Sequence, residues 1–372
     1  MDTSAVYQHT RRAGRLVTRR VVARALSLGA ALASLAVVTD GSPTVAAKKR
    51  RVRGEHNLRG KKAIMCIEGE TRRVPKKQRK KYLKRGATRG ECTGCTPVCA
   101  PGTCGSDGCG GTCSCTAGSV CANETCQTCT VTCASSQTPA ECGDILSGAI
   151  DAGGTVYVCP GLYDAEYDVA GSVTVAVYGA GPGTDPTTSS ILRPAGSTRV
   201  MRIRPLATVT LVGLRLTGGN STVSPASGGG IRVSDDGGGG ANLTLENCAV
   251  SGNSVTGGGG GAMRIYDDSV VVIRGCEIVG NTSTNNTGGA MDSDGDVTIT
   301  DTLIAENEGT WGGGIYSDDG TVTMAPSVTV TRNHATSGGG GFYEEGGTII
   351  PNGAAIFDNT PDNCDGDDPV TC

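Results

Sequence analysis

The sequence predicts an all-β fold, a right-handed parallel β-helix (β-solenoid) preceded by a disulfide-rich N-terminal segment. Three observations carry this prediction: a repeat of about 26 residues in the C-terminal part of the chain, the composition, and the cysteine content. The 372 residues include 59 Gly but only 2 Phe and 1 Trp, which disfavours one large aromatic-rich core. The 18 Cys, beside only 3 His, favour disulfides in an oxidising compartment over mixed Cys/His zinc sites.

Residues 1–47 have the order of features found in a secretory signal peptide. An arginine-rich stretch precedes an apolar run at 25–38, and small residues before Lys48 allow cleavage after Ala47. The apolar run is too short for a transmembrane helix, which needs about 20 residues. The pair Arg19-Arg20 also resembles a twin-arginine signal, so the export route stays open. We expect a bacterial protein that is secreted or displayed on the cell surface, with no transmembrane span in the mature chain.

Charge divides the mature chain into a basic and an acidic part. Residues 48–91 contain 18 Lys/Arg and 4 Asp/Glu, whereas the chain after Glu91 contains 9 Arg, no Lys and 30 Asp/Glu. The basic segment could bind anionic cell-envelope polymers, nucleic acid, or the acidic part of the chain itself. Nucleic acid ranks last of the three, because Tyr82 is the only aromatic residue among these charges.

Residues 48–92 form the predicted basic, Cys-flanked module. Its start at Cys66-Ile67-Glu68-Gly69 and its end at Tyr82-Leu83-Lys84-Arg85-Gly86, closed by Cys92, resemble a short bacterial surface module that begins with Cys-His-x-Gly. All three histidine positions of that module differ here, so the resemblance implies no metal role. We expect a disulfide between Cys66 and Cys92 that closes a small basic fold.

Residues 93–133 are rich in Cys and Gly and resemble a module of secreted bacterial proteins. The segment has almost no apolar side chains, so cross-links must replace a hydrophobic core, and we interpret it as a stiff spacer. Zinc is the alternative, but the short Cys-x-Cys spacings fit a disulfide knot at least as well. The pairing is left open. The disulfide candidates are Cys99, Cys104, Cys109, Cys113, Cys115, Cys121 and Cys126.

Residues 134–372 are predicted to form the β-helix. Copies of the repeat at 209–220, 243–253 and 271–281 alternate β-branched and polar residues and end in Asn, which is a strand pattern and not a helical one. In stacked coils these asparagines should form a ladder of side-chain hydrogen bonds. Cys248 and Cys276 should then be neighbours, as a disulfide or as buried thiols. The ladder residues are Asn220, Asn253, Asn281, Asn307, Asn333 and Asn359.

The Gly-Asn, loop, Gly-Gly-Gly-Ile-Tyr rhythm resembles the β-helix repeats of polymorphic outer-membrane-type proteins and the wider pectin-lyase-like fold. The resemblance covers residues 155–359 and implies the fold, but no particular activity. A short amphipathic helix at 141–152 is expected to cap the first coil, whose edge would otherwise be open. A disulfide between Cys364 and Cys372 is expected to close the other end.

One row of side chains should point outward beside the strands that follow each glycine run. If Ile231, Met263, Met291, Ile315 and Phe342 face the core, their neighbours face solvent. A flat face of Arg, Asp and Tyr suits a glycan ligand, and its carboxylates could also bind Ca²⁺. The plainer interpretation is that the acids are solvated turn residues, with no metal or cofactor. The candidate ligand-binding residues are Arg232, Arg264, Tyr266, Asp292, Asp294, Tyr316, Asp318 and Tyr343.

Two functional hypotheses follow. The first is an exported surface or adhesion-type structural protein whose β-helix face binds a partner, for which glycans are the first candidate. The alternative is a polysaccharide lyase or glycoside hydrolase that acts on an acidic glycan. The sequence has no Gly-His-Gly or Arg-Ile-Lys motif of the polygalacturonases, and His334 lies in a predicted surface loop. No catalytic residue is therefore assigned.

Overall fold

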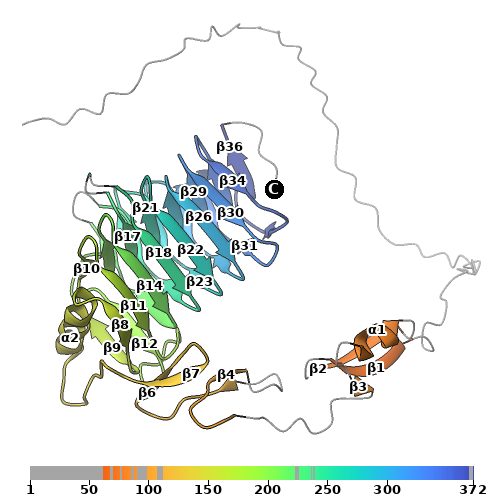
Figure 1. The fold of residues 1–372 in the computed structure, drawn as a ribbon. Coiled ribbons are helices and arrows are strands. Elements are labelled where there is room, and N and C mark those ends of the chain that lie inside the picture. The colour runs from red at the N-terminus through yellow and green to blue at the C-terminus, as the bar shows by residue number, and fades with distance from the viewer. Residues whose placement is uncertain are drawn as a thin grey trace, which may run out of the picture. The chain divides into compact units, whose positions relative to one another are not determined.

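A computed structural model describes residues 62–67, 70–75, 78–84, 88–89, 99–106, 112–222, 226–235, 237, 239–367 and 372. Within it, stacked parallel strands form a β-helix (Figure 1), which confirms the predicted fold class. The signal peptide at 1–47, the start of the basic segment, Cys92 and Cys109 lie outside the described residues, and so does the predicted Cys66–Cys92 disulfide.

Each full coil of the β-helix passes in turn through four parallel sheets, which we number in chain order. Sheet I contains β8 (Gly154–Tyr157), β11 (Thr174–Tyr178), β14 (Thr208–Val212), β18 (Asn242–Glu246), β22 (Val270–Arg274), β26 (Asp296–Thr300), β30 (Thr321–Met324) and β34 (Thr348–Ile350). Sheet II contains β9 (Gly161–Asp164), β12 (Ser190–Arg193), β15 (Leu214–Thr217), β19 (Ala249–Ser251), β23 (Glu277–Val279), β27 (Leu303–Ala305), β31 (Thr329–Thr331) and β35 (Ala355–Phe357).

The other two sheets complete the coil. Sheet III contains β16 (Asn220–Ser221), β20 (Ser254–Thr256), β24 (Thr282–Thr284), β28 (Glu308–Trp311) and β32 (His334–Gly338). Sheet IV contains β10 (Tyr167–Val169), β13 (Met201–Ile203), β17 (Ile231–Val233), β21 (Met263–Ile265), β25 (Met291–Ser293), β29 (Ile315–Ser317), β33 (Phe342–Glu344) and β36 (Cys364–Gly366).

The core runs along the inside of the coils. The five residues predicted to face it in sheet IV pair in register on successive strands and are fully buried, which confirms their inward direction. Because strand side chains alternate between faces, the register also fixes which residues point outward. The five are Ile231, Met263, Met291, Ile315 and Phe342.

A ladder of buried asparagines joins successive coils after sheet II. The side-chain amide of Asn253 donates to Oδ1 of Asn281 at 3.0 Å, and the same bond recurs down to Asn359. Each of these amides also donates to a backbone carbonyl of the preceding coil, for example from Asn281 to Val250 at 3.0 Å. The structure extends the ladder by one residue, because Asn359 donates to Oδ1 of Asn363 at 3.0 Å.

Asn220 does not belong to this ladder, contrary to the sequence prediction. Thr217 pairs with Ser251, so the ladder position of this coil falls on Gly219, whose N–H donates to Oδ1 of Asn253 at 2.9 Å. Asn220 lies one residue further on and is exposed. The copy has two glycines before its Asn where the next copy has one, and this extra residue displaces the side chain.

Helix α2 (Pro139–Asp151) covers the first coil and contacts β9, β10 and β8. Its buried face includes Leu146 and Ile150. The helix begins in a capping box, in which the Thr138 N–H donates to the Glu141 carboxylate at 2.7 Å and the Glu141 N–H donates to the Thr138 hydroxyl at 3.3 Å. No helix in the described part of the chain is long and apolar enough to span a bilayer.

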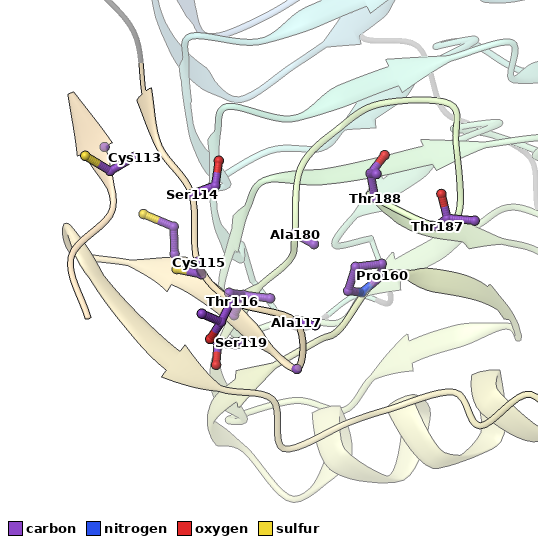
Figure 2. Close-up of a pocket in the computed structure, with 14 residues that line it drawn as sticks. Cys113, Ser114, Cys115, Thr116, Ala117, Ser119, Pro160, Ala180, Thr187 and Thr188 are labelled. Carbon is purple, nitrogen blue, oxygen red and sulfur yellow. The ribbon is translucent and has the colours of Figure 1, made fainter. Parts of the chain in front are cut away.

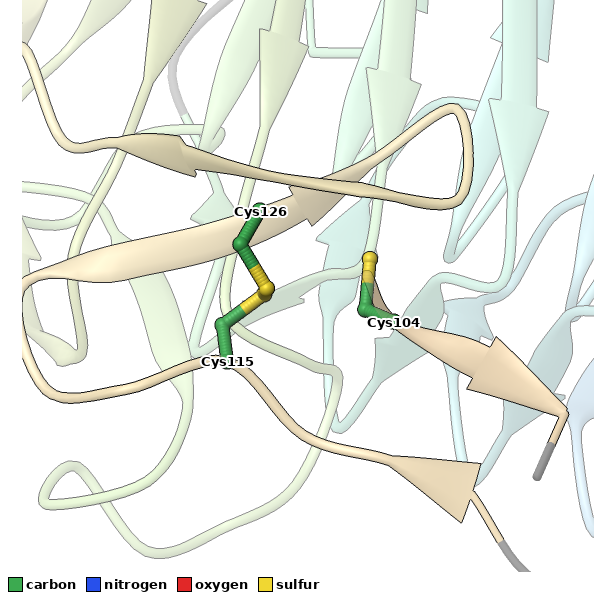
Figure 3. Close-up of side chains that lie close together, drawn as sticks. All are labelled: Cys104, Cys115 and Cys126. Atoms are coloured by element: carbon green, nitrogen blue, oxygen red, sulfur yellow. A yellow bond between two sulfur atoms is a disulfide. The ribbon is translucent and has the colours of Figure 1, made fainter. Parts of the chain in front are cut away.

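The Cys-rich segment contains two small hairpins, β4 (Gly105–Ser106) with β5 (Thr112–Cys113) and β6 (Ser119–Ala122) with β7 (Thr125–Thr128). Two further disulfides attach the end of this segment to the β-helix and to its cap, and neither was singled out from the sequence. Figure 3 shows Cys104, Cys115 and Cys126, whose sulfur atoms lie close enough together for a metal site. All three belong to disulfides and offer no thiolate to a metal ion. The disulfides are Cys99–Cys113, Cys104–Cys121, Cys115–Cys126, Cys129–Cys159, Cys133–Cys142 and Cys364–Cys372.

Cys248 and Cys276 lie on successive coils, as the repeat predicts, and both are buried free thiols. The backbone N–H of Cys248 donates to Sγ of Cys276 at 3.4 Å. The Cys248 thiol donates to the Leu211 carbonyl at 3.3 Å, and the Cys276 thiol donates to the Arg274 carbonyl at 3.2 Å.

The basic module is a small antiparallel sheet with one short helix. Its strands are β1 (Lys62–Ile67), β2 (Glu70–Pro75) and β3 (Thr88–Arg89), with β1 in the centre. Helix α1 (Arg79–Leu83) lies in the connection from β2 to β3, and Lys80, Lys81 and Lys84 are exposed.

Candidate functional site

The predicted binding residues gather on the outer side of sheet IV. Arg232 pairs with Arg264, Arg264 with Asp292, Asp292 with Tyr316 and Tyr316 with Tyr343, so the structure places these five in one row. Tyr266, Asp294 and Asp318 each follow two residues after a member of this row, at the end of its strand.

The row is not the solvent-facing surface that the sequence suggested. Arg232, Asp292 and Tyr316 are buried, with 3%, 4% and 6% of their surface exposed. Glycines pack closely against two of them: a Cβ on Gly259 would lie 1.5 Å from Oδ2 of Asp292, and one on Gly312 would lie 2.9 Å from Cβ of Tyr316. The sequence pattern predicted that these side chains point away from the core, but it did not predict that they are buried.

Arg264 bridges two carboxylates at the centre of the row. Its guanidinium donates one hydrogen bond to Asp292 and another to Asp294, and these three side chains are 15%, 5% and 13% exposed, respectively. Thr287 donates to the second oxygen of Asp292 at 2.5 Å. Asp292 is thus held inside the cluster, whereas Asp294 lies at its rim.

Both arginines of the row are engaged by neighbouring side chains. Arg232 donates to the Asp235 carboxylate at 2.9 Å, and its guanidinium carbon lies 5.1 Å from the ring centre of Tyr266. Arg264 lies 4.5 Å from the same ring centre. Tyr266 therefore lies within cation–π distance of both guanidinium groups.

Burial shifts the pKa of both acids. Burial raises the pKa of Asp294 to about 7, although Arg264 opposes this shift. Burial also raises the pKa of Asp292, again against the effect of Arg264. Oδ1 of Asp294 is buried without a hydrogen-bond partner among the described residues. A carboxyl group with such a pKa is partly protonated at neutral pH and can act as a general acid.

Asp294 lines a hollow of about 610 Å³ whose only charged lining residues are aspartates. Asp267, Asp268, Asp296 and Asp319 also line it, while Asp318 is exposed beside it. Carboxylates are Ca²⁺ ligands, but no three carboxylates of the described residues have oxygens within 4.8 Å of one another. A calcium ion would thus require side-chain rotation in this hollow.

Aromatic side chains form a separate cluster on the later coils. The rings of Tyr316 and Tyr343 stack with their centres 5.8 Å apart, and the ring of Trp311 packs at 59° against Tyr343 with centres 4.9 Å apart. Trp311 is 38% exposed. Sequence reasoning missed it because it lies in the variable stretch after a ladder asparagine, which forms strand β28 here, although it is the only tryptophan of the chain.

A second hollow, of about 520 Å³, lies between the Cys-rich segment and the coil that contains Pro160 (Figure 2). Its lining residues are uncharged and mostly small, with hydroxyl groups from Ser114, Ser119, Thr187 and Thr188. It offers no titratable side chain for catalysis.

Comparison with protein-family models supports this fold. Residues 213–366 match the family model described as a right handed beta helix region, which agrees with the parallel coils and gives their handedness. No curated protein and no solved structure matches the chain.

Proposed function

We propose that this chain is an exported surface or adhesion-type protein that binds glycans on the sheet IV side of its β-helix. The aromatic cluster of Trp311, Tyr316 and Tyr343 carries this proposal. The exposed ring of Trp311 can cover the apolar face of a sugar ring, and its packing against Tyr343, which stacks on Tyr316, holds its orientation before any ligand binds.

The disulfides support export. The six disulfides of the described residues point to an oxidising environment outside the cytoplasm. We further propose that residues 48–91 attach the protein to anionic cell-envelope polymers, because the exposed lysines of α1 add to a segment with a large excess of positive charge.

A glycan array probed with the purified mature chain tests the binding function. We expect a defined set of glycans to bind, with loss of the signal in Trp311→Ala. Phe357→Ala is the matched control, since Phe357 is an exposed aromatic residue on sheet II, with 45% of its surface accessible. Equal binding by both variants would contradict a role for the aromatic cluster, and no binding to any glycan would contradict the proposed function.

Glycoside hydrolysis is the second candidate, and the raised pKa of Asp294 beside the acidic hollow is the observation that favours it. An acidic glycan would be repelled by this hollow, so neutral polysaccharides are the better substrates to assay. Release of reducing ends should be measured with added Ca²⁺ and with a chelator. Activity that Asp294→Asn abolishes without unfolding the protein would support hydrolysis, and activity unchanged in that variant would exclude Asp294 as the acid.

A further inference from the structure

The aromatic cluster lies in the most acidic part of the chain. Arg332 is the only Lys or Arg after Arg274, and it donates to the Glu306 carboxylate at 2.8 Å. Residues Asp365 and Asp367 follow Tyr343 on the next coil, with Asp365 directly in register with Tyr343. Within the part of the chain that the structure describes, neither of these two carboxylates has an ion-pair partner.

The Asp365 carboxylate and the Trp311 ring both lie next to Gly338. A Cβ on this glycine would lie 2.5 Å from Oδ2 of Asp365 and 3.1 Å from Cζ3 of Trp311, so the absence of a side chain lets the carboxylate and the indole both approach this position of the backbone. On the other side of the cluster, the Tyr343 hydroxyl donates to the Asp367 carboxylate at 3.0 Å. Burial raises the pKa of Tyr343, and Asp367 and Asp365 raise it further, as expected in a negative potential.

This combination favours a positively charged ligand. The faces of Trp and Tyr rings attract cations, and unpaired carboxylates add a direct charge–charge attraction. A uronic acid would be repelled by the same groups, and a neutral sugar would leave both carboxylates without an opposite charge. We infer that the Trp311–Tyr343–Asp365 surface binds the protonated amine of an amino sugar in a glycan chain. The inference rests on the proposed glycan-binding function and names its ligand class.

The test compares three oligosaccharides on the full mature chain: a glucosamine tetramer, the N-acetylglucosamine tetramer with the same backbone but no charge, and an oligogalacturonate. Because Trp311 is the only tryptophan, intrinsic fluorescence reports on this surface directly. We expect only the glucosamine tetramer to change the emission, with affinity lost when the pH is raised from about 6 to about 9 and the amine becomes neutral.

Three variants separate the contacts, with affinity measured by calorimetry. Asp365→Asn should weaken glucosamine binding about tenfold, and Gly338→Ala should displace the Asp365 carboxylate from the indole and weaken it similarly. Asp151→Asn, which removes an exposed acid from the end of α2, should leave affinity unchanged. Thermal unfolding should show that all variants remain folded; if Gly338→Ala is destabilised, Asp365→Asn decides alone.

The outcomes distinguish the inference from the function on which it rests. Equal affinity for the acetylated tetramer would overturn the inference and leave glycan binding intact. Binding of an oligolysine peptide in place of the glucosamine tetramer would overturn it in favour of a basic protein partner. Failure of all three oligosaccharides and of the glycan array would reject both.

Discussion

Asn281 donates its side-chain amide to Oδ1 of Asn307 at 3.0 Å, and the same oxygen accepts the backbone N–H of Asn281 at 2.9 Å. One carboxamide oxygen therefore satisfies two donors of the preceding coil, in a place where water has no access. The arrangement repeats along the ladder, so each coil depends on its successor.

Asn281→Ala should destabilise the β-helix by about 3 kcal/mol, because it leaves the buried N–H of Asn253 and the carbonyl of Val250 with one partner fewer each. Urea unfolding followed by circular dichroism measures the change. Asn220→Ala is the matched control and should cost less than about 0.5 kcal/mol, since Asn220 is exposed outside the ladder. Equal losses in the two variants would contradict the register described here.

Asp294 should make stability fall as the pH rises. Its pKa is raised from 3.8 to about 7 in the folded chain, so between these values the folded state binds more protons than the unfolded state. The stabilisation from this group is complete below about pH 4 and decreases by at most about 1.4 kcal/mol per pH unit up to about pH 7. Unfolding free energies across this range should show a smaller decline in Asp294→Asn than in the unmodified chain. A parallel decline in both proteins would place the responsible groups elsewhere.

Cys248 and Cys276 should resist alkylation in the folded protein. Both thiols are buried, with 1% and 2% of their surface exposed, and burial raises the pKa of Cys248 well above its usual range. Iodoacetamide should label them only after unfolding in the absence of reductant, as peptide mass mapping would show. Rapid labelling of the native chain, or a disulfide between the two, would refute this expectation.

Attachment through the basic module should depend on salt. Exposed charges are screened within about 8 Å at physiological ionic strength, so deletion of residues 48–91 should release the protein from cells at low salt. The milder change of Lys80, Lys81 and Lys84 to Gln should lower the salt concentration needed for release. Trp311→Ala should leave attachment unchanged while it affects glycan binding. A truncated protein that stays on the cells would place the anchor elsewhere in the chain.

The fold was predictable because its hydrogen-bonded asparagines and alternating strand residues recur at a visible period. The error at Asn220 arose where a copy has an extra glycine, since the register of β15 with β19, and not the nearest Asn, defines the ladder position. The same period also predicted which residues of sheet IV lie in register in one outward row, from Arg232 to Tyr343.

The surface properties of the candidate site were less accessible from sequence. Burial of Asp292 depends on the close approach of Gly259, whose place before the glycine run is taken by Thr287 in the next coil, so the repeat does not predict it. Trp311 has the same place before a glycine run, at the end of β28, and its contact with Tyr343 crosses from sheet III to sheet IV. Disulfides such as Cys129–Cys159 join segments 30 residues apart, and no sequence spacing distinguishes that pairing from others.

The Cys129–Cys159 disulfide also decides where mechanical tension would travel. A pull that enters the chain before Cys129, as from an anchored N-terminal module, passes through the sulfur bridge directly to Cys159 and into the first coils. Residues 130–158, including α2 and β8, form a closed loop outside this covalent path. The covalent path therefore bypasses the cap. Helix α2 can stay in place over the edge of the first coil when the protein is under tension.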